Sequence, residues 1–91
     1  MTYDELFALA TRFRDQPLTT VTGREFTVGT DRDSIVFIPA STGRGQSDGR
    51  KAAERFLARY TETGSLRPVD YAAVTRNASD LIGLIRAATE T

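Results

Sequence analysis

The chain has 91 residues, and its 12 basic side chains balance its 12 acidic ones, so the formal net charge is zero. It contains no histidine, cysteine or tryptophan, which excludes Ser-His-Asp and Cys-His catalysis, zinc sites built from those ligands, thiol redox chemistry and disulfide bonds. The length and a hydrophobic content of 40% are typical of one small domain, which we expect to span residues 1–91.

The sequence gives no indication of a membrane segment. No apolar run approaches the roughly 18 residues that a membrane-spanning helix needs. The chain starts with acidic residues, Asp4 and Glu5, where a signal peptide would have basic ones. We therefore expect a cytoplasmic protein that does not contact a membrane.

The first predicted element is a helix from Tyr3 to about Asp15. Residues Thr2 and Glu5 have the spacing of a capping box, which marks a helix start. Pro17 prevents the helix from continuing. The apolar residues between these signals recur at helical spacing: Leu6, Leu9, Ala10 and Phe13.

The next segments predict β-structure. Leu18 to Thr22 and Glu25 to Val28 are rich in β-branched residues, which favours two strands or one bulged strand. Asp31 to Ser34 has the composition of a turn, and the apolar run from Ile35 to Ile38 predicts a strand buried on both faces. We expect a hairpin from about Arg24 to Ile38.

The chain then predicts a loop and a second helix. Residues 40–49 are rich in glycine, serine, threonine and charge, which is typical of a loop. From Arg50 to Glu62 the apolar residues recur on one helix face, with Ser47 or Asp48 as the candidate N-cap and Gly64 as the C-cap.

Two more helices are predicted at the end of the chain. Pro68 suits the first turn of a short helix from Val69 to about Arg76. Asn77 would end that helix in the left-handed conformation, and Ser79 would cap a final, largely apolar helix. The fold class that follows is α+β: an N-terminal helix, a β-hairpin or small antiparallel sheet of two or three strands, then three helices.

The middle of the chain is its basic part. Between positions 44 and 76, seven Lys or Arg residues stand against four Asp or Glu, whereas residues 1–33 carry four Arg against six acids. Nonspecific coating of nucleic acid needs many uncompensated cations, so the zero net charge argues against it. A local basic surface is still compatible with phosphate contacts, to which arginine is well suited.

Two features of this basic part could hold an anion. The loop at 40–49 precedes a helix, whose N-terminus presents N–H groups and the positive end of its dipole. It lacks the Gly-Lys-Ser/Thr ending of a P-loop, and a mobile surface loop would have the same composition. The spacing of Lys51, Arg55 and Arg59 places three cations on one side of the helix, although a solvated face interleaved with acids would look alike.

The segment from Pro68 to Ile82 resembles a loose helix-turn-helix. Its second helix carries only one cation, Arg86, among many apolar residues, which favours core packing over base reading. If DNA is bound, we expect the basic loop and helix to contact it.

The sequence thus predicts a small non-enzymatic binding domain that engages nucleic acid, DNA in particular. The alternative is a protein-interaction or assembly module of a larger complex, such as an accessory protein of a mobile element or phage, or a homo-oligomer. No catalytic residue, cofactor, metal or small-molecule substrate is indicated. The candidate binding residues for nucleic acid or another partner are Arg44, Arg50, Lys51, Arg55, Arg59, Arg67 and Arg76.

Overall fold

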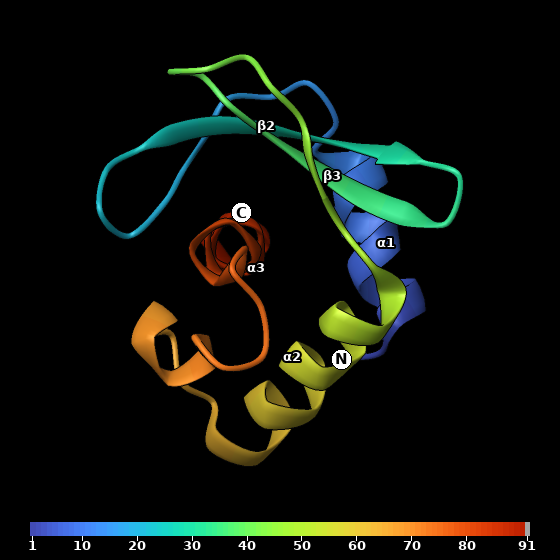
Figure 1. The fold of residues 1–91 in the computed structure, drawn as a ribbon, viewed down its shortest axis with the longest axis vertical. Helices are drawn as coiled ribbons and strands as arrows, with labels where there is room; N and C mark the ends of the chain where they lie inside the picture. The colour runs from blue at the N-terminus through green and yellow to red at the C-terminus, as the bar shows by residue number, and fades with distance from the viewer. Residues whose placement is uncertain (91) are drawn as a thin grey trace.

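The computed structural model describes residues 1–90 and shows an α+β fold, with helices packed against one face of an antiparallel sheet (Figure 1). The sheet has four strands in the order β1 (Leu18–Thr19), β2 (Glu25–Asp31), β3 (Ser34–Pro39) and β4 (Gln46–Asp48). The helices are α1 (Tyr3–Arg12), α2 (Arg50–Thr63), the 3₁₀-helix η1 (Pro68–Tyr71) and α3 (Ala78–Glu90). None of the helices in this part of the chain has the length and apolar character to cross a membrane.

The first helix begins as predicted and ends earlier. The Thr2 hydroxyl accepts the Glu5 N–H, and the Glu5 carboxylate accepts the Thr2 N–H, so the capping box is confirmed. The helix ends at Arg12, three residues before the predicted end at Asp15. Asp15 has a left-handed φ of 62° and donates its N–H to the Val28 carbonyl at 3.1 Å, which turns the chain onto the sheet.

The predicted hairpin is confirmed, and two strands flank it. In the β2–β3 pair, Val28 lies opposite Phe37. Side chains alternate along β3, so Ile35 and Phe37 are buried whereas Val36 and Ile38 are half-buried on the other face. The prediction that this run is buried on both faces is therefore wrong, because the helices cover only one face of the sheet.

Part of the predicted 40–49 loop is the strand β4, which adds a fourth strand where two or three were expected. Ser47 pairs with Val36 of β3. A Cβ at Gly45 would lie 2.9 Å from the Val36 Cγ1 atom, so the missing side chain lets the returning chain approach β3 closely. The sequence of this segment is dominated by turn residues and does not predict a strand. The strand forms because the segment pairs with β3, which is a contact between separate parts of the chain.

Helix α2 runs from Arg50 to Thr63, close to the predicted bounds. Its N-cap is Gly49, and neither predicted cap is correct, because Ser47 and Asp48 belong to β4. Gly64 ends the helix with a left-handed φ of 63° and donates its N–H to the Tyr60 carbonyl at 2.7 Å, which confirms the predicted C-cap.

Three helices are predicted after the hairpin. The structure has two α-helices there, α2 and α3, and the middle one of the three is only the short 3₁₀-helix η1. Residues 72–77 turn instead of extending η1 to Arg76, because Thr75 and Asn77 bond to Asp48 of β4. Asn77 does not have the predicted left-handed φ, and Ser79 lies inside α3 instead of capping it.

Helix α3 lies at the centre of the core. Its apolar side chains pack with those of the other helices and of the inner sheet face, and its buried residues include Leu81, Ile82, Leu84 and Ile85. Gly83 faces the sheet, where an added Cβ would lie 3.0 Å from the Phe26 ring and 3.1 Å from the Thr19 carbonyl oxygen. The close approach of α3 to β1 and β2 therefore depends on a residue without a side chain.

Candidate nucleic-acid interface

Two of the predicted cations on α2 hold the helices together. The Arg50 guanidinium lies over the Tyr3 ring, 4.9 Å from its centroid, and its Nε is 3.6 Å from a Glu54 carboxylate oxygen. At the other end of α2, Arg59 donates from Nη1 to the Asp70 carbonyl at 3.0 Å. These contacts link α2 to α1 and to η1, so both side chains have structural partners.

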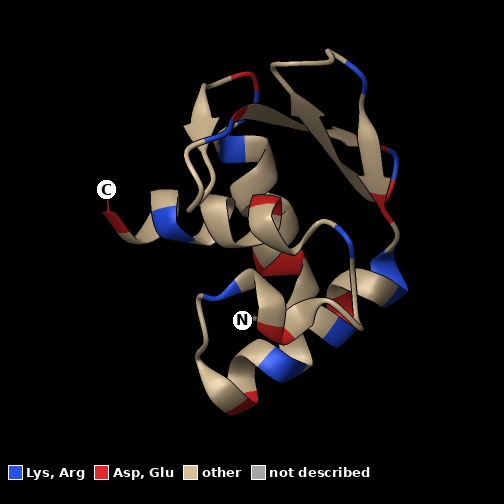
Figure 2. Cartoon of the chain, turned by 60° about the vertical axis from the view of Figure 1, so that its left-hand side comes forward, with Lys and Arg blue, Asp and Glu red and all other residues tan. Residues whose placement is uncertain are grey.

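The other two predicted cations on α2, Lys51 and Arg55, are exposed and form no ion pair in the described residues. They lie on the side of the helix opposite the buried Phe56, as the spacing predicts. Figure 2 shows that acidic and basic residues are interspersed over the ribbon, α2 included. The cationic surface is therefore small and does not extend over a whole face.

The remaining predicted cations come from three separate segments. Arg44 is in the β3–β4 connection, Arg67 immediately precedes η1, and Arg76 lies between η1 and α3. All three are exposed, and from residue 1 to residue 90 none of them takes part in an ion pair. Of the three, Arg76 has the most distinctive position, because it lines two neighbouring hollows of the surface.

The first hollow, which we call the small cavity, has a volume of about 410 Å³. Gly49 and Ala52, at the N-terminal end of α2, line it on one side, and residues 72–77 line it on the other. Of the predicted cations, Arg76 lines this hollow. Arg55 lies one turn after Ala52 on α2.

A buried polar cluster lies beside the small cavity. The Asp48 Oδ1 atom accepts hydrogen bonds from the Thr75 hydroxyl at 2.9 Å and from the Asn77 amide nitrogen at 3.1 Å. The other oxygens, Asp48 Oδ2 and Asn77 Oδ1, are buried and have no hydrogen-bond partner within residues 1–90. Buried acceptors are seldom left unpaired, because each loses its hydration without compensation.

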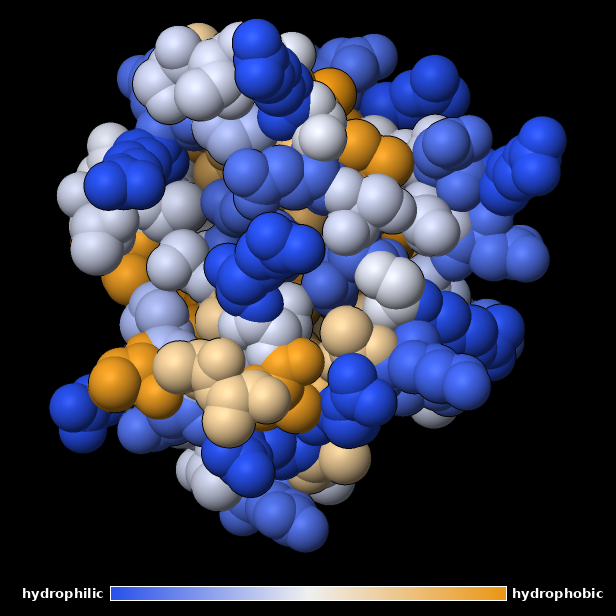
Figure 3. Space-filling model, viewed as in Figure 1, coloured by the Kyte–Doolittle hydropathy of each residue, from blue (hydrophilic) through white to orange (hydrophobic). Residues whose placement is uncertain are grey.

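The second hollow, which we call the polar groove, is larger, with a volume of about 1070 Å³. It lies between the β1–β2 turn, the β3–β4 connection and the start of α3. The polar side chains that line it include Arg24, Ser41, Gln46, Arg76, Ser79 and Asp80. Figure 3 shows mostly hydrophilic side chains over the upper part of this view, where the sheet lies.

Asp80 is the ionisable group of the polar groove whose pKa is shifted by its environment. Burial raises the pKa of its carboxyl group above the ordinary value, and the nearby positive charge of Arg24 partly opposes that shift. Asp80 lies in the first turn of α3, where the helix dipole favours a negative charge. An incompletely solvated carboxylate in a groove is a common feature of binding sites.

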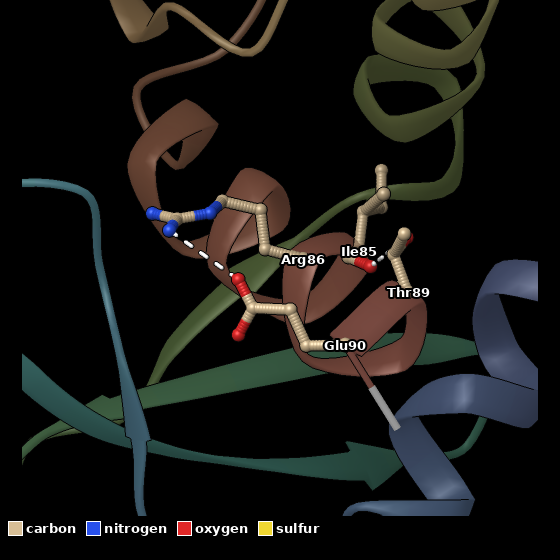
Figure 4. A network of polar contacts seen from close by, with 4 residues as sticks. All are labelled: Ile85, Arg86, Thr89 and Glu90. Atoms are coloured by element: carbon tan, nitrogen blue, oxygen red, sulfur yellow. Dashed lines mark hydrogen bonds and ion pairs between the residues drawn. The ribbon is translucent and has the colours of Figure 1, made fainter.

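The segment that resembles a helix-turn-helix does not present a recognition helix on the surface. Helix α3, which would read the bases, is the most buried helix of the core. Its Arg86 extends toward Glu90, with Nη2 and Oε1 3.4 Å apart, while the Thr89 hydroxyl bonds to the Ile85 carbonyl (Figure 4). The one cation of α3 is therefore paired within its own helix.

The sequence did not indicate the polar groove. Arg24 and Asp80 are 56 positions apart in the chain, and neither lies in a motif. They come together because the β1–β2 turn packs beside the start of α3. Among residues 1–90, no group of three or more acidic side chains is placed to hold a metal ion.

Comparisons with known proteins give no relative from which a role could be transferred: no family model, no curated protein and no solved structure shows a significant match to the chain.

Proposed function

We propose that the protein is a small non-enzymatic domain that binds nucleic acid, DNA in particular, through phosphate contacts. The observation that carries this proposal is the position of Lys51, Arg55 and Arg76. Lys51 and Arg55 belong to the first two turns of α2, and Arg76 lines the small cavity at which that helix begins. All three are exposed, and none of them forms an ion pair in residues 1–90. We define them as the basic face.

The surroundings of the basic face support an anion as ligand. Helix α2 has 14 residues and begins at the small cavity, so its N-terminal N–H groups and dipole favour an anion there, whereas the acceptor oxygens of Asp48 on the cavity wall oppose one. Arginine and lysine at such a position contact phosphate oxygens without reading the sequence. The basic face is small, which fits a domain that makes few phosphate contacts.

The salt dependence of binding tests this proposal. Each phosphate contact lowers the slope of log K against log salt by about 0.9 on duplex DNA, so three contacts give a slope near −3. We expect the variant Lys51→Ala/Arg55→Ala/Arg76→Ala to lose most of its affinity for labelled DNA and to have a slope near zero. Fluorescence anisotropy at several salt concentrations measures both quantities.

A matched control is the variant Arg12→Ala/Arg14→Ala/Arg86→Ala, which removes the same number of charges outside the basic face. Arg12 lies over the Phe13 ring, and the other two pair with Asp15 and Glu90. Its affinity should fall much less than that of the basic-face variant. Equal losses in the two variants would show that only net charge matters and would contradict the proposal.

A second candidate function is binding of a protein partner, and an exposed apolar strip favours it. The most exposed large apolar residues near η1 are Leu66 and Val69, with 43% and 65% of their surface accessible. Figure 3 shows apolar side chains at lower left, where η1 lies in Figure 1. Exposed apolar patches of this kind are typical of protein interfaces. Failure of the protein to bind any nucleic acid at low salt would favour this second function.

A further inference from the structure

The polar groove contains hydrogen-bonding side chains that have no protein partner among the described residues. Arg24 and Arg76 are donors, Asp80 is an acceptor, and Gln46 is both. Throughout residues 1–90 these side chains form no hydrogen bond and no ion pair, although Arg24 and Asp80 attract each other electrostatically. The groove therefore offers both signs of charge and both hydrogen-bonding roles to a ligand.

The position of the polar groove relates it to the basic face. Arg76 lines the small cavity and the polar groove, so the two hollows share one wall. A strand whose phosphates lie along the basic face would pass the mouth of the groove. The groove volume of about 1070 Å³ is enough for one nucleotide and its hydration, because binding pockets for small organic ligands start at about 300 Å³.

We infer that the polar groove takes one unpaired nucleotide of the bound strand, and that Asp80 accepts a hydrogen bond from the exocyclic amino group of its base. This inference rests on the proposed function. Arg24 and Arg76 then lie beside the sugar-phosphate backbone, and the hydroxyls of Ser41 and Ser79 face the remaining polar edges.

The chemistry of a carboxylate selects among bases. Carboxylate oxygens only accept hydrogen bonds, and they pair with the amino group of cytosine. Thymine has carbonyl oxygens instead of an amino group, and these oxygens are repelled by a carboxylate. The groove therefore favours bases with an amino group, and it favours single strands over a duplex, in which base edges are already paired.

The test compares labelled single strands of deoxycytidine and of thymidine, each about 12 nucleotides long, which covers the usual site size of small single-strand-binding domains. We expect the protein to bind the cytosine strand about tenfold more tightly than the thymine strand, the discrimination typical of one good base contact. The variant Asp80→Ala should reduce that ratio to within about twofold, because the cytosine strand loses its hydrogen bond and the thymine strand loses the repulsion.

Asp4→Ala is the matched control, because Asp4 lies in the first turn of α1 as Asp80 lies in the first turn of α3. It should keep the tenfold preference. Equal binding of the two strands, or a preference that survives in Asp80→Ala, would overturn the role of the groove and leave the phosphate contacts intact. Absence of binding to every nucleic acid at low salt would overturn the proposed function as well.

Discussion

The apolar core and the region around the two hollows differ in how well their groups are satisfied. In the core, between the sheet and the helices, Phe37, Phe56 and Leu81 are completely buried among apolar neighbours. Around the hollows, where residues 72–80 meet the sheet, several polar side chains form no hydrogen bond within residues 1–90, and two buried oxygens beside the small cavity have no partner there. Buried polar groups without a partner cost stability, so the two oxygens beside the small cavity indicate a ligand site instead of a folding requirement.

Removal of a core aromatic ring should produce the largest effect. We expect Phe37→Ala to lower the free energy of unfolding by about 3–5 kcal/mol, because it leaves a cavity between the sheet and the helices. Urea denaturation followed by circular dichroism measures this loss. Val69→Ala is the control, since the Val69 side chain is 65% exposed and its truncation should change stability by less than about 0.5 kcal/mol. Similar losses in the two variants would contradict the assignment of the core.

Asp80 provides a smaller effect with a defined dependence on pH. Its pKa in the folded protein is raised by burial, so the folded state favours the protonated carboxyl group. The contribution of Asp80 to stability is therefore largest in acid and is lost as the pH rises through the raised pKa. Relative to the natural protein, Asp80→Asn should become more stable as the pH rises from 3 to 7, by about 1 kcal/mol or less because the group is still partly solvated.

The capping-box residue Glu5 should show the opposite dependence of stability on pH. Hydrogen bonds with Thr2 lower the pKa of the Glu5 carboxyl group, so its contribution to stability is present at neutral pH and is lost in acid. Thermal unfolding of Asp80→Asn and Glu5→Gln should be measured across the same pH range. As the pH rises, Asp80→Asn should gain stability relative to the natural protein, and Glu5→Gln should lose it. If both variants changed in stability in the same direction, the folded protein would not disfavour the charged form of Asp80, in contradiction to its buried position in the groove.

Local signals predicted much of the fold. The capping box at Thr2, the β-hairpin, the apolar face of α2 and the cap at Gly64 each depend on residues close together in the sequence. The strand β4 was missed because glycine and serine dominate its surroundings, and its pairing with β3 is not a property of its own sequence. The end of η1 was misplaced because Thr75 is bonded to Asp48, 27 positions earlier.

The candidate site was less predictable than the fold. Charge and spacing made Lys51, Arg55 and Arg76 candidates together with Arg50 and Arg59, and they could not show that the last two have structural partners on other elements. The polar groove was not predicted, because its walls are distant in the sequence and its side chains are common surface residues. The spacing of residues in the sequence does not predict a site whose walls come from segments that meet only in the folded protein.

Nuclear magnetic resonance can locate the proposed nucleic-acid contact on the protein. Amide chemical shifts of ¹⁵N-labelled protein, followed during titration with a single-stranded cytosine oligonucleotide, report which residues the ligand approaches. We expect the largest changes within residues 20–26, 39–41, 46–55 and 72–80, which include the basic face and the walls of both hollows, with little change in α1. Changes confined to Leu66, Val69 and their neighbours, or no changes at all, would contradict the proposed site.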